Sequence, residues 1–546
     1  MKQWICLLLC IGIGIFSSCG SKEDDPVAVT FQLEEIEING ETNASSYTNI
    51  DPTLHVALTF SDNVDQSTLQ DNITLRTSTG RSVELIHDIQ DKTVIIQPTT
   101  TLASYTSYQL IINTGLRSTS GHRILTGKVY AISTGIDPAD KFPRISDEEL
   151  LTLVQKQTFS YFWDFGHPVS GMAHERSTSG NMVTTGGTGF GVMAMIVAVE
   201  REFITREEAL QRIRQIVTFL DTRCTRYHGA FAHWINGETG ETVPFSTYDN
   251  GADMVETSLL FQGLLAARQY FNRDATGEIE LREDITRLWE GIDWTWFRKE
   301  DENALYWHWS PQHEWQMNLK IQGWNESLIT YVLAAASPTH SISKEVYDQG
   351  WARNGGMRNG ASYHGFTLPL GPDYGGPMFF AHYSFLGLNP NGLKDSYSDY
   401  WVQNRNHALI NYSYCVENPQ GYSGYSEYCW GLTASDGNNG YSAHSPTNDK
   451  GVITPTAALS SMPYTPEESM AALHFFYYKL GDKLWKQYGF IDAFNLTEEW
   501  YASDFLAIDQ GPVIVMIENY RTGLLWDLFM DIPEIQVGLT KLGFTY

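Results

Sequence analysis

Basic residues are scarce in this chain of 546 residues. Lysine and arginine together number 36, against 64 aspartates and glutamates, so the formal net charge is −28. Nucleic-acid phosphates and anionic lipid head groups both attract lysine and arginine, so this deficit argues against either kind of partner. The length is sufficient for two or three domains and a large core.

Cysteine is scarce as well, and its spacing is not that of a metal site. Three cysteines lie beyond the N-terminal segment: Cys224, Cys415 and Cys429. Because three is an odd number, at least one has no disulfide partner, although Cys415 and Cys429 could pair in an oxidising compartment. No Cys-x-x-Cys spacing is present, so we expect no structural zinc, no other metal and no cofactor.

Long hydrophobic runs are absent, and the apolar run from Trp4 to Phe16 is too short to span a membrane permanently. It precedes Ser17-Ser18-Cys19, a pattern that resembles a bacterial lipoprotein signal, with residues 1–18 removed and Cys19 lipidated. The acidic tract that follows, residues 21–25, resembles the export signal of Bacteroidetes lipoproteins. We therefore expect a lipid anchor at the outer membrane, facing the cell surface or the periplasm. The alternative is an ordinary cleaved secretory signal.

Residues 27–135 have the pattern of short β-strands. Segments 83–89, 93–97, 108–113 and 129–134 are rich in β-branched and aromatic residues and are separated by turn residues. The sequence predicts a small β-sandwich here. Asp51-Pro52, residues 60–65 and Ser133-Thr134 resemble bacterial Ig-like domains. No catalytic cluster is visible, so we expect a spacer, with glycan binding as a second option.

Residues 146–546 have helical patterning instead. Ser146 and Glu149 form a predicted capping box, and Thr205 with Glu208 forms another. The spacing of the helices suits a toroid of paired helices, so the predicted fold class is mostly α with a small all-β domain in front. The loops 351–383 and 421–445 are long and rich in aromatic and polar residues, which is typical of functional loops that build a cleft.

The acidic stretch from Tyr248 to Glu256 is the strongest candidate for chemistry. Asp249, Asp253 and Glu256 have the spacing i, i+4 and i+7, which places them on one face of a helix. The apolar pattern predicts that helix over residues 252–270, and the turn dipeptide at 250–251 puts Asp249 just before it or at its cap. Crowded carboxylates repel one another, so one of them is readily held protonated. Glycosidic cleavage needs a protonated acid near an ionised one. The alternative is that these acids are there because helix N-termini favour negative charge.

Three further acids are candidates. Glu326 precedes an apolar helical run, and such a setting raises a carboxyl pKa by desolvation, although it could also be an exposed residue of a first helical turn. Asp509 lies among apolar residues at the start of another helix and could be only a helix cap. Asp436 is predicted to be a turn residue.

Candidate sugar-binding residues gather in the same segments. Aromatic residues make up 13% of the chain, and aromatic faces stack on sugar rings, although a helical core rich in aromatics would look similar. The candidates for substrate binding are His174, Arg176, Trp307, Trp324, His382, Tyr383, Arg405 and His407.

Several separated motifs resemble one family. Residues 161–165, 248–253, 323–326, 509–512 and 518–521 resemble the bacterial glucoamylase-like domain, and more narrowly the endo-β-1,2-glucanases of glycoside hydrolase family 144. The resemblance covers about residues 146–546. It implies an (α/α)6 barrel, an inverting mechanism, and a linear β-1,2-glucan substrate that is cut mainly to sophorose and short oligosaccharides. Asp249, Asp253, Glu256 and Glu326 match acids that the family places in its cleft, whereas Asp509 is a candidate from its local sequence alone.

In an inverting mechanism one carboxylic acid protonates the leaving oxygen and a carboxylate activates a water. The sequence favours Glu326 as the acid, Asp509 as the base and Asp253 as the next choice, with Asp249 and Glu256 binding hydroxyls or tuning charge. We expect a monomeric enzyme. The alternatives are an exo-acting glucosidase or glucoamylase on another glucan, a non-catalytic glycan-binding lipoprotein, and a polysaccharide lyase, which the negative charge disfavours.

Overall fold

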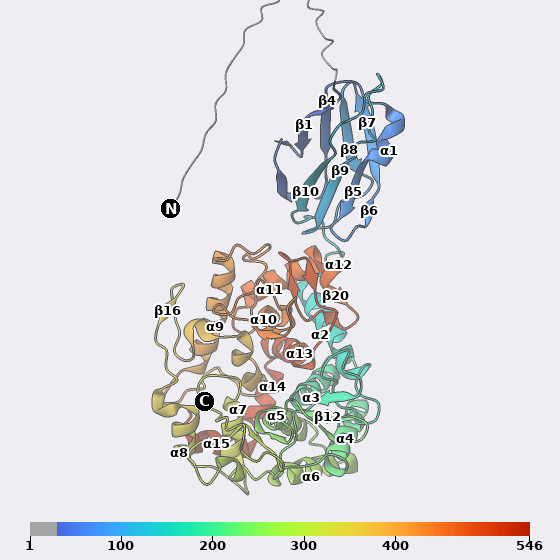
Figure 1. Ribbon diagram of the computed structural model, residues 1–546. Coiled ribbons are helices and arrows are strands. Elements are labelled where there is room, and N and C mark those ends of the chain that lie inside the picture. Colours follow the sequence, from blue (N-terminus) through green and yellow to red (C-terminus); the bar gives the residue numbers. More distant parts are fainter. Residues whose placement is uncertain (1–29) are drawn as a thin grey trace, which may run out of the picture. The chain divides into compact units, whose positions relative to one another are not determined.

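A computed structural model describes residues 30–546 and divides the chain into two compact units, residues 1–135 and 136–546. The predicted signal peptide and Cys19 lie outside the described residues. No helix in the described part of the chain is long and apolar enough to cross a membrane. The two units are described separately below (Figure 1).

The first unit is a sandwich of two five-stranded sheets. Their strand orders are β2-β1-β4-β8-β7 and β3-β10-β9-β5-β6, and all neighbouring strands are antiparallel except β3 and β10. The strands are β1 (Leu33–Ile38), β2 (Glu41–Thr42), β3 (Ser46–Ile50), β4 (Val56–Phe60), β5 (Ile73–Thr77), β6 (Ser82–Val83), β7 (Leu85–Gln90), β8 (Thr93–Pro98), β9 (Ser107–Ile112) and β10 (Lys128–Thr134).

The alternation of side chains along each strand explains the sandwich. In β4, Val56, Leu58 and Phe60 are buried, whereas Ala57 and Thr59 between them are half-buried. Successive side chains of a strand point to opposite faces, so the buried set of each sheet meets that of the other in one core.

The second unit is built mainly of helices, and its loops carry short strands. The longer ones are α2 (Asp147–Trp163), α3 (Thr185–Glu200), α4 (Arg206–Thr222), α5 (Met254–Tyr270), α6 (Thr276–Glu290), α7 (Leu328–Ala336), α9 (Tyr400–Glu417), α11 (Pro466–His474), α13 (Ala507–Arg521), α14 (Leu524–Met530) and α15 (Pro533–Leu542). Both predicted capping boxes are present, at the starts of α2 and α4. The sandwich and the helical unit confirm the predicted fold class.

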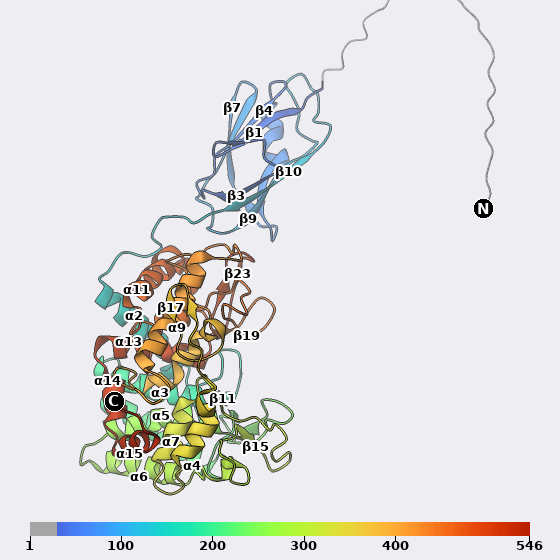
Figure 2. The ribbon, with the colours of Figure 1, turned by 90° about the vertical axis from the view of Figure 1, so that its left-hand side faces the viewer.

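Four helices form the inside of this unit. Nearly every residue of α3, α5, α7 and α13 is buried, which is typical of helices surrounded by other helices. By contrast, α4 and α6 are apolar along one face only, and they cover the inner helices (Figure 2). The inner pair α3 and α5 approaches closely because Gly189 and Gly263 meet: a Cβ on Gly263 would lie 2.1 Å from the carbonyl oxygen of Gly189.

The predicted long loops are ordered by short elements rather than by long strands or helices. Hairpin β16 (Ser362–Tyr363) and β17 (Phe366–Thr367) forms part of the first loop, and β18 (Ala434–Ser435) with β19 (Ser442–Ala443) forms part of the second. A further hairpin pairs β14 (Ala252–Asp253) with β15 (His308–Trp309). This last pairing brings two distant segments to the start of α5.

Candidate active site

The helical unit contains a cavity of about 590 Å³ at the N-terminal ends of its inner helices. Its lining includes Thr184 before α3, Asp253 before α5, Glu326 before α7 and Ile508 in the first turn of α13. Helix N-termini carry partial positive charge and unpaired N–H groups, so this end of the unit stabilises carboxylates.

Asp253 is the cap of α5. Its Oδ1 accepts hydrogen bonds from the N–H groups of Val255 and Glu256, both at 2.9 Å, and its side chain is buried. Its Oδ2 lies 3.1 Å from Nδ1 of His233 and 3.8 Å from Nδ1 of His308. Burial alone would raise the pKa of Asp253, but the hydrogen bond from His233 and the charges of both imidazoles lower it. Asp253 is therefore ionised at neutral pH.

The side chain of Glu256 binds the N-terminus of the neighbouring helix α3. Its Oε2 accepts a hydrogen bond of 2.7 Å from the N–H of Gly186, in the first turn of α3. Burial and the nearby charge of Asp253 raise the pKa of Glu256, although His233 opposes this shift. Asp249, also buried, lies 3.3 Å from Nδ1 of His308 through its Oδ1. The three acids of the predicted stretch thus share one site.

Two histidines balance this charge. Burial lowers the pKa of His233, but the carboxylates of Glu256, Asp253 and Asp249 outweigh burial and raise it to about 9. The pKa of His308 is also raised: Asp249 and Asp253 outweigh the effect of its burial. The imidazole of His233 is therefore positively charged at neutral pH, and the same carboxylates favour the charged form of His308.

Glu326 enters the cavity from the turn before α7. Burial raises its pKa to about 7, and the negative charges of Asp253 and Glu256 push it in the same direction. No cation contributes to this shift. Glu326 is therefore an acid of the cavity that keeps its proton up to a pH of about 7, which agrees with the role that the sequence predicts for it.

Asp509 lies apart from these acids. It faces a small separate cavity with Asp492, and both carboxyl groups are buried. Burial, together with repulsion from Asp492, holds the pKa of Asp509 well above its usual value, and burial raises the pKa of Asp492 to about 7. Two carboxyl groups so close share a proton. A raised pKa and a position outside the lining of the main cavity make Asp509 poorly suited to the role of general base.

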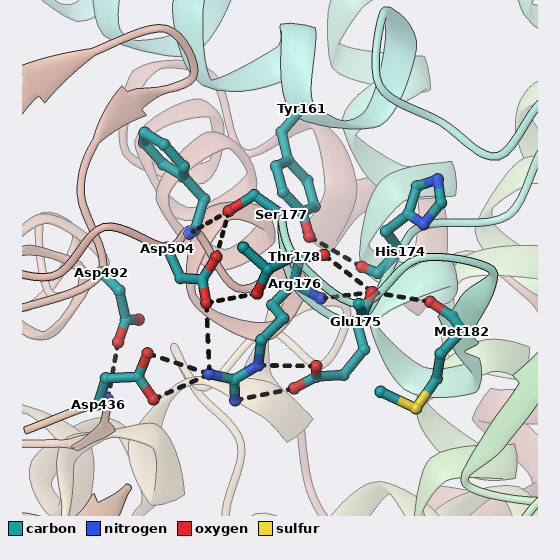
Figure 3. A network of polar contacts seen from close by, with 12 residues as sticks. Tyr161, His174, Glu175, Arg176, Ser177, Thr178, Met182, Asp436, Asp492 and Asp504 are labelled. Atoms are coloured by element: carbon teal, nitrogen blue, oxygen red, sulfur yellow. Dashed lines mark hydrogen bonds and ion pairs between the residues drawn. The ribbon is translucent and has the colours of Figure 1, made fainter. Parts of the chain in front are cut away.

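Arg176 holds one wall of the cavity together (Figure 3). Its Nη1 donates to both oxygens of Asp436, at 3.0 and 3.1 Å, and its Nε and Nη2 donate to Glu175 at 2.9 and 3.2 Å. A third carboxylate, Asp504, lies 3.8 Å from Nη1. Asp436 is thus an ion-paired residue rather than the simple turn residue that the sequence predicts, and its N–H donates to Asp492 at 2.7 Å.

The other predicted sugar-binding residues divide into two groups. Trp307 and Tyr383 line the cavity with Arg176. Trp324, His382 and His407 are buried in the core: Trp324 packs against Phe385 and Tyr400, His382 hydrogen-bonds Ser461, and His407 hydrogen-bonds the carbonyl of Gly376. His174 stacks on Phe165, and Arg405 is exposed, and neither is among the lining residues.

Sequence reasoning missed several lining residues. His233, Trp234, Phe245 and Tyr441 come from loops and from a strand that no acidic motif marks. His233 stacks on the ring of Phe245, with centroids 4.4 Å apart. In the sequence, the only sign of a role for His233 is that it lies among aromatic residues. Its contact with Asp253 forms only in the folded chain.

His233, Asp249 and Asp253 also lie close enough to hold a metal ion, since one ligand atom from each falls within 4.8 Å of the others. In the described structure the imidazole of His233 and the carboxylate of Asp253 pair directly, so each has a partner of opposite charge without an ion. The absence of a metal cofactor stays a prediction.

A helical unit that gathers buried acids at the N-terminal ends of its inner helices has the features of a carbohydrate-active enzyme. Comparison with known proteins makes the class specific. The family description "Putative glucoamylase" matches residues 318–533, and "Bacterial Ig-like domain" matches residues 34–134.

Solved structures and a curated relative agree with these matches. The chain is 58% identical to a glucoamylase-annotated protein of Bacteroides uniformis and 52% identical to an endo-β-1,2-glucanase of Chitinophaga pinensis in complex with sophorotriose and glucose. Each match covers 74% of this chain and 99% of the other, with TM-scores of 0.73 and 0.72. The chain belongs to this glucoamylase-like family of bacterial β-1,2-glucan hydrolases, as its motifs predict.

A relative in Parabacteroides distasonis has a different mode of action. It is an exo β-1,2-glucooligosaccharide sophorohydrolase that acts at the non-reducing end, 46% identical over 444 residues. The match covers 77% of this chain but only 61% of the relative. An endo-β-1,2-glucanase of Talaromyces funiculosus is only 10% identical, with a TM-score of 0.52, and shares the fold alone.

The raised pKa of Glu326 generates a prediction about pH. Because the general acid must be protonated, kcat should fall as pH rises through about 7. Glu326→Gln keeps the shape of the side chain but cannot supply a proton, so kcat should drop by roughly 10²- to 10⁴-fold and this alkaline limb should disappear. Steady-state rates between acidic and alkaline pH measure both effects.

Glu207→Gln, an exposed change on the outer helix α4, is the matched control and should leave the pH profile unchanged. If Glu326→Gln kept a near wild-type rate with the same alkaline limb, Glu326 would not be the proton donor.

Proposed function

We propose that this protein is an inverting endo-β-1,2-glucanase that releases sophorose and short β-1,2-gluco-oligosaccharides. One observation carries the proposal: a single cavity combines a protonated carboxylic acid, Glu326, with an ionised carboxylate, Asp253, which are the two protonation states that the reaction needs. The 52% identity to an endo-β-1,2-glucanase, over 99% of that chain, supports the linkage and the endo mode.

In this mechanism Glu326 protonates the glycosidic oxygen and Asp253 activates the attacking water. Each carboxylate oxygen has two lone pairs, so Oδ2 of Asp253 keeps one for a water while it accepts the hydrogen bond from His233. His233 and His308 hold Asp253 in its ionised form. Asp249 and Glu256 fix the two histidines, and Trp307 and Tyr383 offer aromatic faces for sugar rings.

The structure changes the preferred base. The local sequence favours Asp509, but Asp509 shares a separate cavity with Asp492, and burial and that neighbour raise its pKa. Asp253, the second choice from the sequence, lines the cavity that contains Glu326. We therefore assign the water-activating role to Asp253.

Purified linear β-1,2-glucan tests the activity directly. Released reducing ends should appear, early products should form a ladder of oligosaccharides, and NMR should detect the α-anomer first, because an inverting enzyme changes the β configuration. The activity should survive dialysis against EDTA, because no step in this mechanism uses a metal.

Three other results would point elsewhere. Sophorose as the sole early product would indicate exo action of the kind that the Parabacteroides relative shows. Binding without release from any glucan would favour a glycan-binding lipoprotein, and an unsaturated product that absorbs ultraviolet light would favour a lyase. Azide should restore activity to Asp253→Asn but not to Asp509→Asn; the reverse would make Asp509 the base.

We also propose that the protein is a lipid-anchored surface enzyme and that the Ig-like unit is a spacer between anchor and barrel. Within residues 30–135 no aromatic side chain is exposed: Phe31, Tyr47, Phe60 and Tyr108 are buried, and the other two tyrosines are half-buried. A sugar-binding face usually offers an open aromatic ring. The monomeric state stays a prediction.

Cys19 tests the location. Cys19→Ala should release the protein from the membrane fraction while the activity per molecule stays at the wild-type level, because the described residues that line the cavity, from Glu175 to Ile508, all belong to the helical unit. Cell fractionation with an immunoblot and an activity assay measures both. Cys224→Ala, a change at a buried cysteine of the helical unit, is the control and should stay membrane-bound. Unchanged membrane attachment of Cys19→Ala would contradict lipidation at this residue.

A further inference from the structure

One tryptophan outside the cavity is exposed. Among the tryptophans that the structure describes, Trp296 alone belongs to the exposed large hydrophobic residues, with 40% of its surface accessible, and the others are buried or half-buried. Burial of an indole ring is favourable, so a tryptophan that stays exposed to water lacks this stabilisation. An exposed tryptophan next to other aromatic rings is therefore a candidate binding surface.

The neighbours of Trp296 hold its ring in place. The imidazole of His228 stacks on it, with centroids 3.8 Å apart and planes at 13°. Trp309 meets it edge-on at 5.8 Å, and Trp315 lies at 6.4 Å with planes at 31°. Burial lowers the pKa of His228, so this imidazole is neutral at neutral pH. The cluster therefore combines three indole rings with a neutral imidazole.

Two chain segments connect this surface to the cavity. On the first, Trp307 lines the cavity and Trp309 belongs to the cluster, two residues further along. The chain turns at Ser310, which exchanges backbone hydrogen bonds with Glu314, and returns beside itself.

On the returning segment, Trp315 belongs to the cluster, and Met317 and Leu319 line the cavity. The backbone N–H of Trp307 donates to the carbonyl of Leu319 at 2.9 Å, so the two segments run side by side. Trp307 and Trp309 are two residues apart on the outgoing segment, which leads into the short strand β15, and the returning segment turns at Trp315, whose carbonyl accepts from the N–H of Asn318 at 2.9 Å. The aromatic cluster and part of the cavity wall therefore belong to the same pair of segments.

The cluster also offers polar groups. In the described part of the chain, the indole N–H groups of Trp296, Trp309 and Trp315 donate to no protein acceptor, and none of the three is a buried unpaired donor. Indole combines an apolar face with one N–H donor, a combination that suits the C–H face and the hydroxyl groups of a sugar ring.

From this geometry we propose that Trp296, Trp309 and Trp315 form a second glucan-binding site, which holds the part of the β-1,2-glucan chain that extends out of the cavity. The occupant is the same polysaccharide, because the cluster is aromatic and lies on the two segments that also supply Trp307, Met317 and Leu319 to the cavity wall. This inference rests on the proposed function for the identity of the glucan. The site would favour long chains over short ones without taking part in the chemistry.

Trp296→Ala in the full chain tests the site. Short β-1,2-gluco-oligosaccharides that fill only the cavity should be cleaved with unchanged kcat and KM. Long β-1,2-glucan should show a KM raised by about 3- to 10-fold, which is the effect expected for loss of one aromatic contact. Trp296→Phe should restore part of the difference, since it keeps an aromatic face.

Tyr520→Ala is the matched control. Tyr520 is 42% exposed and lies at the far end of α13 from Ile508, which lines the cavity. It should behave as wild type on both substrates. An equal loss by Trp296→Ala on short and long substrates would mean that Trp296 only supports the cavity, and an unchanged KM for the long glucan would overturn the site.

Retardation in native gels that contain long β-1,2-glucan gives a reading independent of cleavage. In the inactive Glu326→Gln background, retardation should weaken when Trp296→Ala is added and should not weaken when Tyr520→Ala is added. Wild type that binds this glucan without cleaving it would reject the proposed activity while leaving the site supported if Trp296→Ala binds less. Equal retardation with and without Trp296→Ala, or retardation of neither, would reject the site.

Discussion

Asp253 joins the fold of the helical unit to its chemistry. One oxygen of its carboxylate caps α5 through two backbone N–H groups, and the other faces His233 and His308. Capping bonds of this kind contribute about 1 kcal/mol to stability. Asp253 therefore both starts α5 and serves as the ionised carboxylate of the cavity. A shift in the start of α5 would move this carboxylate away from His233 and His308.

The other acids depend on the same arrangement. Glu256, in the first turn of α5, accepts a hydrogen bond from the first turn of α3, so acids of one short stretch bind the N-termini of two neighbouring inner helices. Three carboxylates so close would repel one another strongly, and the two imidazoles offset most of that repulsion. Glu326 pairs with no cation, so the negative charges of Asp253 and Glu256 raise its pKa further.

The sequence predicted the two units, the capping boxes and the main acids because these depend on local patterns. Period-two and helical patterns distinguish a sandwich from a helical barrel, and the spacing of Asp249, Asp253 and Glu256 places them together. The sequence places Asp249 just before the helix or at its cap and Asp253 within the helix, whereas Asp253 is itself the cap of α5 and meets Glu256 around its N-terminus.

The errors arise where distant segments meet. Asp509 looks like an active-site acid from its neighbours in the chain, but its decisive partner is Asp492, seventeen positions earlier, across a separate cavity. His233 carries no motif, and its raised pKa exists only beside Asp253 and Glu256. Likewise, a lone Asp436 resembles a turn residue until Arg176, from a segment far earlier in the chain, is found against it.

The central claim is that imidazolium charge keeps Asp253 ionised while Glu326 stays protonated. The most direct measurement is the pH dependence of kcat/KM for His233→Gln, with His340→Gln, whose histidine pairs with Asp293, as control. Removal of a positive charge 3.1 Å from Asp253 should raise the pKa of that carboxylate and move the acidic limb to higher pH by roughly one unit or more, while the control stays at the wild-type position. An acidic limb that does not move in His233→Gln would contradict the account.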